Sequence, residues 1–388
     1  MTRRGARQKK LILLSPGPTI VPATVKRIWA RAEMHHRVEP FPPIWGRLRE
    51  KLQSFFEIDN PIPFVRRGGG TEMMEAAIYN TVRLGDNALV LNHGYFGNRF
   101  VDMLERRGVI PDQVKSEWGF PIDPRAAQKH LVSWGKKHYR AIFAQATDTS
   151  TGVRNDLETI GKIIRTHSNA LFVVDAVFEA AVGPIRMEAW GIDVLLCASQ
   201  KGFMMPEGIG FMVLSERAFN RIADRGLTVP YSWDIVEEWE RNQKGDTLAT
   251  PPIRLMQCLD YVLGRYLRSG THRLYEVNQR KAYLLRDALH VMGLWLLCEP
   301  EVGPRASIRS NGLTVIDLAR VGVESNAVVD ELIRTEGIIT ANGQGDLKGK
   351  VLRVAHFGAV TFKNHLVPFL RGLERALDTC GTRRNLNI

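Results

Sequence analysis

Residues 171–202 of the chain read LFVVDAVFEAAVGPIRMEAWGIDVLLCASQKG, and this stretch decides the fold. It holds two apolar runs of strand length, Leu171–Asp175 and Val194–Ala198. Continuous apolar runs of this length are typical of strands buried on both faces of a parallel sheet. A carboxylate, Asp175, closes the first run, and Gln200-Lys201 follow the second. The stretch therefore predicts buried strands with reactive side chains at their carboxyl ends, where open α/β sheets bind ligands.

The same pattern extends to both sides of this stretch. Strand-like runs alternate with helix-like segments, so we predict the α/β fold class, with a large, mostly parallel sheet covered by helices. The further strand-like runs are residues 88–92, 141–146 and 209–214, and the helix-like segments are residues 72–82, 96–107, 124–134 and 157–167.

The pattern changes near Thr250-Pro251-Pro252. From there we predict two long helices, over residues 253–267 and 271–292, and then a smaller α/β unit. We assign residues 1–22 to an N-terminal arm, 23–265 to a large domain and 266–388 to a small C-terminal domain. The smaller unit has predicted strands at residues 313–318 and 351–355 and predicted helices at 325–335 and 362–377.

Composition is that of a globular protein with an excess of positive charge. The 388 residues are 44% hydrophobic and 24% charged, which excludes a disordered or collagenous chain. With 53 Lys+Arg against 41 Asp+Glu, the formal net charge is +12. Such an excess of positive charge either forms a surface that binds nucleic acid or a membrane, or binds anionic small molecules. Basic residues cluster only in the first ten positions, so we expect neither nucleic acid nor membrane as a partner.

The spacing of the cysteines and the length of the apolar runs indicate in which cellular compartment the protein resides. The four cysteines lie far apart, without the spacing of a disulfide framework or a zinc site, so we expect reduced thiols and no metal. The apolar runs are strand-length, whereas a membrane helix needs about 18 apolar residues. A cytoplasmic protein is the resulting expectation. The cysteines are Cys197, Cys258, Cys298 and Cys380.

Three features of the large domain carry chemistry. Consecutive glycines, Gly68-Gly69-Gly70, precede Thr71 and a helix, and such a helix start favours an anion such as phosphate. Alone, the glycines are also compatible with a plain turn. Asp175 taken singly could equally be a helix cap or a turn former. Lys201 taken singly could be a solvated surface group, but in a desolvated pocket an amine becomes a nucleophile towards carbonyls.

The three features together have a meaning that none has alone. A phosphate cradle, a buried carboxylate and a Schiff-base lysine are what pyridoxal 5′-phosphate requires. Asp175 would keep the pyridine nitrogen protonated, and Lys201 would bind the cofactor as a Schiff base. Once an amino substrate displaces it, the free Lys201 amine can move the proton between Cα and C4′.

At these residues the chain resembles the class V aminotransferases of fold type I, nearest the alanine–glyoxylate and serine–pyruvate group. The resemblance runs from Leu14 to about Leu377. It rests on segments in family order: Leu14-Ser15-Pro16-Gly17-Pro18, His36-Arg37, Gly69-Gly70-Thr71 with Glu75-Ala76-Ala77, Asn92-His93-Gly94-Tyr95-Phe96-Gly97, Thr149-Ser150-Thr151-Gly152, Asp175-Ala176-Val177, Ser199-Gln200-Lys201, Thr250-Pro251-Pro252, Gly343-Gln344-Gly345 and Leu352-Arg353-Val354.

The resemblance implies a homodimeric, pyridoxal-phosphate-dependent aminotransferase acting on small amino acids and 2-oxo acids such as glyoxylate or pyruvate. In such a dimer the N-terminal arm packs on the partner subunit. The resemblance also assigns roles to site residues. These are phosphate binding by Gly69, Gly70, Thr71, Gln200 and, across the dimer interface, Thr250; ring stacking by Phe96; contact with the phenolic oxygen by Thr149; and binding of the substrate carboxylate by Arg353.

The chain departs from the family pattern at several positions. Ala146 stands where the family has His, and Phe178-Glu179 are bulkier and more acidic than the usual serines. A Tyr that contacts phosphate in the family is replaced by Thr247. Arg66-Arg67 precede the phosphate loop in place of small residues. We hypothesise that Arg67 compensates with charge near the phosphate, or recognises a second anionic group of the substrate.

A cysteine desulfurase or another pyridoxal-phosphate lyase of the same fold is the main alternative. Desulfurases of this class resemble one another in a His directly before the lysine, where this chain has Gln200. They also need a reactive cysteine on a mobile loop, whereas Cys258 and Cys298 lie in stretches that we expect to be buried. The sequence therefore favours the aminotransferase.

Overall fold

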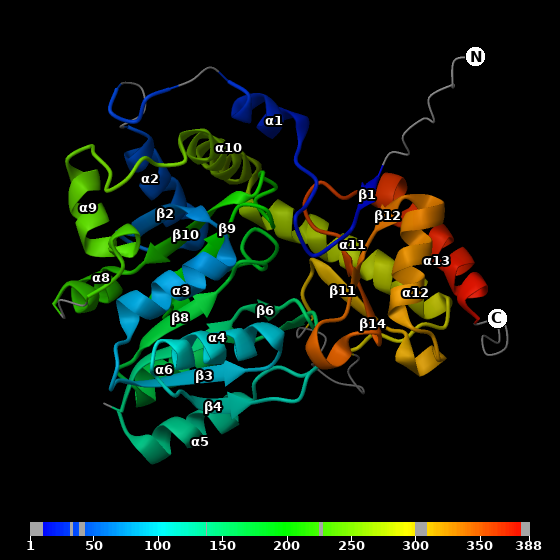
Figure 1. The fold of residues 1–388 in the computed structure, drawn as a ribbon, viewed down its shortest axis with the longest axis horizontal. Helices are drawn as coiled ribbons and strands as arrows, with labels where there is room; N and C mark the ends of the chain where they lie inside the picture. The colour runs from blue at the N-terminus through cyan, green and yellow to red at the C-terminus, as the bar shows by residue number, and fades with distance from the viewer. Residues whose placement is uncertain are drawn as a thin grey trace.

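A computed structural model describes residues 11–31, 34–38, 43–136, 138–224, 228–298 and 309–381. Its centre is a seven-stranded sheet with the strand order β2-β10-β9-β8-β5-β3-β4 (Figure 1). The five strands from β9 to β4 are parallel to one another, and β10 is antiparallel to both of its neighbours. The strands are β2 (Ile62–Gly68), β3 (Asn87–Asn92), β4 (Asp112–Lys115), β5 (Tyr139–Gln145), β8 (Leu171–Asp175), β9 (Val194–Ala198) and β10 (Gly208–Leu214).

The predicted α/β class with a mostly parallel sheet is confirmed. The strands β8 and β9 have the predicted bounds, because their side chains are buried on both faces and the apolar run marks each strand along its whole length. The sequence did not predict β2 and β4 or the antiparallel direction of β10. Strand direction depends on the length and path of the connection, which apolar periodicity does not encode.

Helices cover both faces of this sheet. One face packs against α3 (Gly70–Thr81), α4 (Tyr95–Arg106), α8 (Glu216–Ala223) and α9 (Ile235–Gln243). The other packs against α2 (Ile44–Phe56), α5 (Pro124–Trp134), α6 (Leu157–His167), α7 (Met187–Trp190) and α10 (Ile253–Ser269). The predicted helices over residues 124–134 and 157–167 have the observed bounds.

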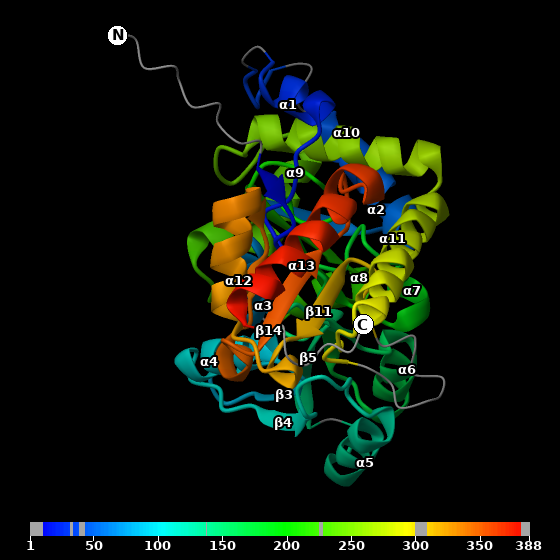
Figure 2. The ribbon, with the colours of Figure 1, turned by 90° about the vertical axis from the view of Figure 1, so that its right-hand side faces the viewer.

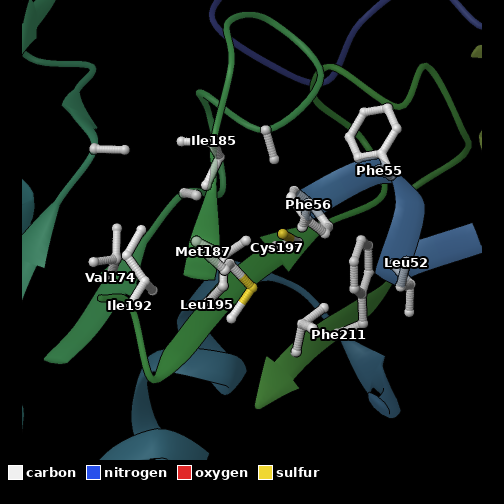
Figure 3. Close-up of a cluster of buried hydrophobic side chains, with 14 of the residues drawn as sticks. Leu52, Phe55, Phe56, Val174, Ile185, Met187, Ile192, Leu195, Cys197 and Phe211 are labelled. Carbon is white, nitrogen blue, oxygen red and sulfur yellow. The ribbon is translucent and has the colours of Figure 1, made fainter. Parts of the chain in front are cut away.

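The helix α2, which the sequence did not predict, supplies much of the core on its face of the sheet. Figure 3 shows its side chains Leu52, Phe55 and Phe56 against Cys197 of β9 and Phe211 of β10. Each of these five side chains is buried. Burying one such apolar side chain contributes about 1.5–3 kcal/mol, so α2 is a main anchor of the sheet.

The C-terminal part forms a second, smaller α/β unit (Figure 2). The long helix α11 (Thr271–Val291) leads into a three-stranded sheet, β11 (Leu313–Asp317), β14 (Val351–Ala355) and β13 (Ala341–Asn342). The helices α12 (Ser325–Glu331) and α13 (Val367–Cys380) pack on that sheet. Each is joined to a π-helical turn, Leu332–Glu336 after α12 and Phe362–Leu366 before α13.

The described part of the N-terminal arm packs on its own chain. The short strand β1 (Ile12–Leu13) pairs in parallel with β12 (Ile338–Ile339) of the C-terminal unit. Leu14 is fully buried among the C-terminal apolar side chains, and its carbonyl accepts a hydrogen bond from the Ala355 N–H. The expected packing of the arm on a partner subunit stays a prediction. The basic residues 1–10 lie outside the described residues, and the division at residues 22 and 265 stays a prediction.

Within the described residues, no helix is long and apolar enough to cross a membrane.

Candidate active site

One cavity lies where the carboxyl ends of β5, β8 and β9 meet the amino ends of α3 and α4. Its volume is about 190 Å³. Chain segments that follow three neighbouring parallel strands converge there, as expected at one edge of an open α/β sheet. The lining residues are Gly70, Thr71, Met74, Phe96, Arg99, Thr147, Thr149, Asp175, Val177, Phe178, Gln200 and Lys201.

The cavity brings together most of the residues that the sequence predicted for the site. Seven of them line it: Gly70, Thr71, Phe96, Thr149, Asp175, Gln200 and Lys201. Three predicted residues, Gly69, Thr250 and Arg353, are not among its lining residues.

Lys201 is half-buried at the start of the segment that follows β9. Its Nζ donates a hydrogen bond to the Pro16 carbonyl oxygen at 2.7 Å. Burial, and then the positive charge of Arg353, lower the pKa of the Lys201 amine to about 8, while the Asp175 carboxylate opposes the shift. The amine is therefore partly neutral near neutral pH, which a nucleophile or proton carrier requires.

A glycine lets the N-terminal segment cross Lys201 at this short distance. Gly17 has φ +137°, and a Cβ at this position would lie 2.3 Å from Lys201 Nζ. Any side chain here would push the end of Lys201 aside and would adopt a strained backbone conformation. The LSPGP segment (residues 14–18) thus forms part of the lysine's surroundings, 185 residues away in sequence.

Asp175 closes β8 and faces the cavity. Its Oδ1 accepts a hydrogen bond from the Val177 N–H at 2.9 Å. Burial raises the pKa of the Asp175 carboxyl to about 6, although the Val177 N–H and the positive charges of Arg99 and Lys201 stabilise its ionised form. At pH 7 and above, Asp175 is therefore mostly a carboxylate.

The amino end of α3 forms another wall of the cavity. The Gly69 N–H donates to the Glu72 carboxylate at 2.7 Å, so this donor is occupied from within the helix. A Cβ on Gly70 would come within 2.7 Å of the Val177 side chain, so only glycine fits there. The Gln200 side chain lies beside Gly69, and its buried Oε1 has no hydrogen-bond partner. Such an unsatisfied buried acceptor is expected where a ligand completes the site.

A buried carboxylate that the sequence did not single out, Asp148, positions the aromatic residue Phe96. Its Oδ2 accepts a hydrogen bond from the Phe96 N–H at 2.8 Å, and its Oδ1 accepts from the Ser150 hydroxyl at 2.6 Å. A carboxylate at the start of α4 satisfies free helix N–H groups and complements the helix dipole. Gly94 is required beside it, because a Cβ there would lie 2.4 Å from Asp148 Cγ.

Arg99 is a second cavity residue that the sequence did not single out. It lies one turn after Phe96 on α4, and its guanidinium carbon is 4.6 Å from the centroid of the Phe96 ring. Its Nη1 donates to Thr71 Oγ1 at 3.0 Å. The signal that could have found it is the three-residue spacing from Phe96, which places both side chains on one face of the helix.

Arg353 lies in β14, directly behind Thr149. Its Nη1 donates to the Thr149 carbonyl oxygen at 2.9 Å and to Gln344 Oε1 at 3.0 Å, and its Nε donates to the Asn342 carbonyl oxygen at 2.7 Å. Burial lowers the pKa of the Arg353 guanidinium to about 10. Thr250, in contrast, is exposed on the chain.

Two departures from the family pattern have structural explanations. Arg66 is buried and donates to the Glu238 carboxylate at 2.7 Å, so it joins β2 to α9 and does not reach the cavity. Glu179 is also buried, and its Oε2 accepts hydrogen bonds from the hydroxyls of Thr147 at 2.7 Å and Ser310 at 2.8 Å. Glu179 therefore ties the cavity wall to the C-terminal unit.

Arg67, for which we hypothesised a ligand-binding role, is exposed and does not line the cavity.

No cysteine of the described residues lines the cavity. Cys197 and Cys258 are buried, and burial raises the pKa of both thiols, that of Cys258 to about 11. Such thiols are poor nucleophiles. Within the same part of the chain, no three or more His, Cys, Asp or Glu side chains are grouped to hold a metal ion.

Comparison with known proteins places the chain in a family. The model of the class V aminotransferases matches residues 23–344. The chain therefore belongs to the class V aminotransferase family, as its resemblance implied, and it is an aminotransferase with the fold of type I pyridoxal-phosphate enzymes.

Individual relatives cover almost the whole chain. The chain is 30% identical to the 42 kDa subunit of a soluble hydrogenase from Anabaena cylindrica, over 92% of this chain and 91% of the relative. It is 27% identical to a serine–glyoxylate aminotransferase from Methylorubrum extorquens, over 98% and 94%. A solved structure of alanine–glyoxylate aminotransferase from Nostoc sp. superposes with a TM-score of 0.88 at 27% identity, covering 97% of this chain and 98% of that one.

Proposed function

We propose that this aminotransferase binds pyridoxal 5′-phosphate in the cavity and moves an amino group from a small amino acid to a 2-oxo acid such as glyoxylate or pyruvate. The observation that carries the proposal is the convergence of Lys201, Asp175 and the amino end of α3 on one cavity. A primary amine, a carboxylate and an anion-binding helix end match the aldehyde, ring nitrogen and phosphate of this cofactor. The Gln200 amide nitrogen, which lies beside Gly69, is a donor that suits this phosphate.

Bound pyridoxal phosphate would supply an electron sink for the substrate's Cα carbanion. The chain's own part is to hold the reacting groups and move protons. Lys201 is the residue that attaches to the cofactor aldehyde, and its free amine carries the proton at Nζ. Because its pKa is about 8, a substantial fraction of this amine is unprotonated at pH 7.5. Asp175 holds the proton on the ring nitrogen, because its carboxylate is ionised at that pH.

The remaining roles follow from position. Phe96 stacks on the ring, Thr149 contacts the phenolic oxygen, and Gly70, Thr71 and Gln200 bind the phosphate. Gly69 joins them when its N–H exchanges the Glu72 carboxylate for a phosphate oxygen as acceptor. Support comes from the cavity itself, which all of these residues line except Gly69, the neighbour of Gly70 and Gln200.

Arg353 binds the substrate carboxylate. A planar guanidinium matches a carboxylate, and Arg353 is held directly behind Thr149 of the cavity wall. For the substrates, the supporting observation is that relatives across the whole chain length are named as serine–glyoxylate and alanine–glyoxylate aminotransferases.

We further propose that the protein acts as a homodimer in the cytoplasm. Thr250 is exposed on the single chain, as a residue that reaches a partner's phosphate would be. A light-scattering mass of one chain at micromolar concentration would contradict the dimer.

The experiment for the function is a half-reaction screen. Purified protein with bound cofactor is mixed with single amino acids while the cofactor absorbance is followed, and the keto acid product is identified. We expect a bleached cofactor band and glyoxylate- or pyruvate-dependent recovery with serine or alanine. Sulfide released from cysteine, without a keto acid from any donor, would instead indicate the desulfurase alternative.

A matched lysine makes the attachment site testable. Lys281 is buried, and burial lowers its pKa to about 8, as for Lys201, but its Nζ donates to the Gly358 carbonyl oxygen away from the cavity. After borohydride reduction, peptide mass spectrometry should find the cofactor on Lys201 and not on Lys281. Attachment that persists in Lys201→Ala would contradict the assignment.

A further inference from the structure

Arg99 stands inside the cavity at the end where α3 begins. Its Nη1 donates to the Thr71 hydroxyl oxygen at 3.0 Å, and its guanidinium lies over the Phe96 ring, 4.6 Å from the centroid. The side chain therefore touches one residue of the helix start and one aromatic residue of the wall. Of the residues that line the cavity in the described part of the chain, Arg99 and Lys201 are the cations.

The hydrogen bond to Thr71 has a directional consequence. A guanidinium can only donate, so Thr71 Oγ1 accepts from Arg99 with a lone pair. The hydroxyl proton of Thr71 then remains available to donate to a neighbouring oxygen. Arg99 thus places a positive charge at this end of the cavity. It also orients the Thr71 hydroxyl so that its proton can be donated to an anion.

Apart from Lys201, no other positively charged side chain of the described residues lines the cavity. Arg67 is exposed and does not line the cavity, and Arg66 is committed to Glu238 on α9. The Tyr expected at residue 247 is Thr247, whose buried hydroxyl has no partner. Arg99 is therefore the guanidinium that the cavity offers to a phosphate.

We propose that Arg99 binds the phosphate of the cofactor, directly through its guanidinium and indirectly by orienting Thr71. This inference rests on the proposed binding of pyridoxal phosphate. Guanidinium–phosphate hydrogen bonds are charge-assisted and strong, and the free N–H groups at the start of α3 add to them. Arg99, and not Arg67, then supplies the positive charge near the phosphate.

The test compares pyridoxal 5′-phosphate with pyridoxal, which lacks only the phosphate. Apoenzyme of the wild type, Arg99→Gln and Arg99→Lys is titrated with each compound, and Kd is read from fluorescence quenching and from the rise in unfolding temperature. We expect Arg99→Gln to weaken pyridoxal phosphate by about tenfold to a hundredfold and pyridoxal by less than about threefold. Arg99→Lys should retain part of the affinity for pyridoxal phosphate, because lysine keeps the positive charge but lacks the planar, two-pronged guanidinium.

Arg106→Gln is the matched control. Arg106 lies on the same helix, is exposed, and pairs with Asp102, so its loss removes the same charge away from the cavity. It should leave both dissociation constants unchanged. An equal loss of both compounds in Arg99→Gln would overturn the proposal, because Arg99 would then act through the Phe96 ring alone. An unchanged Kd for pyridoxal phosphate in Arg99→Gln would overturn it too. A wild type that binds neither compound would instead reject the proposed function.

Discussion

The proton affinity of Lys201 can be tested without any cofactor. Burial and Arg353 lower the pKa of the Lys201 amine to about 8, and Asp175 opposes them. Neutralising each neighbour should therefore shift the pKa in opposite directions. Arg353→Gln removes a positive charge and should raise it, whereas Asp175→Asn removes a negative charge and should lower it. At pH 7.5, a pKa of about 8 leaves roughly a quarter of the amine neutral, against about 0.1% for an ordinary lysine.

The assay is competitive acetylation of the apoenzyme across pH, with the labelled fraction of each lysine peptide read by mass spectrometry. The labelling of Lys201 should reach half of its maximum near pH 8. Lys281 is an internal reference in the same tube, because burial alone lowers its pKa, also to about 8. Its profile should not change in either variant. Circular dichroism checks that both variants fold.

Three outcomes would refute the reasoning. The first is a Lys201 profile with its midpoint near 10, which would mean that the amine is hydrated. The second is a shift of the same sign in Arg353→Gln and Asp175→Asn. The third is a parallel shift of Lys281, because a change common to both lysines would report a general change of the fold and not the local charges.

Two further predictions concern packing around the site and the sheet. Gly17→Ala should weaken cofactor binding by more than tenfold in a fluorescence titration, because its Cβ would displace the Lys201 side chain and because φ +137° at this position disfavours any residue but glycine. Gly46→Ala, with nothing within 4 Å, should bind normally. Equal binding by the two variants would contradict the crossing of Lys201 by the N-terminal segment. Glu238→Ala should lower the free energy of unfolding by about 3–5 kcal/mol in urea, because it leaves the buried Arg66 guanidinium unpaired. Glu158→Ala, which breaks an exposed pair, should change it far less, and a similar loss in both would argue against a buried pair.

The strands and helices of the large domain could be read from the sequence because their causes are local. The runs Leu171–Asp175 and Val194–Ala198 are apolar on both faces, and the helices over residues 124–134 and 157–167 begin at Asp123 and Asp156, whose side chains cap the first turn. Elements with weaker local sequence signals were not predicted. Strand β2 carries a proline and two arginines, and its place at the sheet edge becomes visible only in the pairing with β10.

Parts of the candidate site could be predicted for a similar reason. Asp175 and Lys201 directly follow buried strands, and strand ends meet at one edge of a parallel sheet. Arg99 and Asp148 were not predicted as site residues, because their roles depend on contacts with residues that are distant in the sequence. Asp148 reaches the start of α4, 52 residues earlier in the chain, and nothing in its local sequence marks that contact.

By itself, the sequence determined the α/β class, the family and the residues that carry the proposed chemistry, because strand patterns and motif residues are properties of neighbours along the chain. The tertiary structure alone decided which charges act in the cavity. Of the arginines near the site, Arg66 is neutralised by a carboxylate 172 residues away, Arg67 stays on the surface, and Arg99 enters the cavity. Electrostatic energy depends on distance and burial in space, and folding sets both between residues that are far apart in sequence.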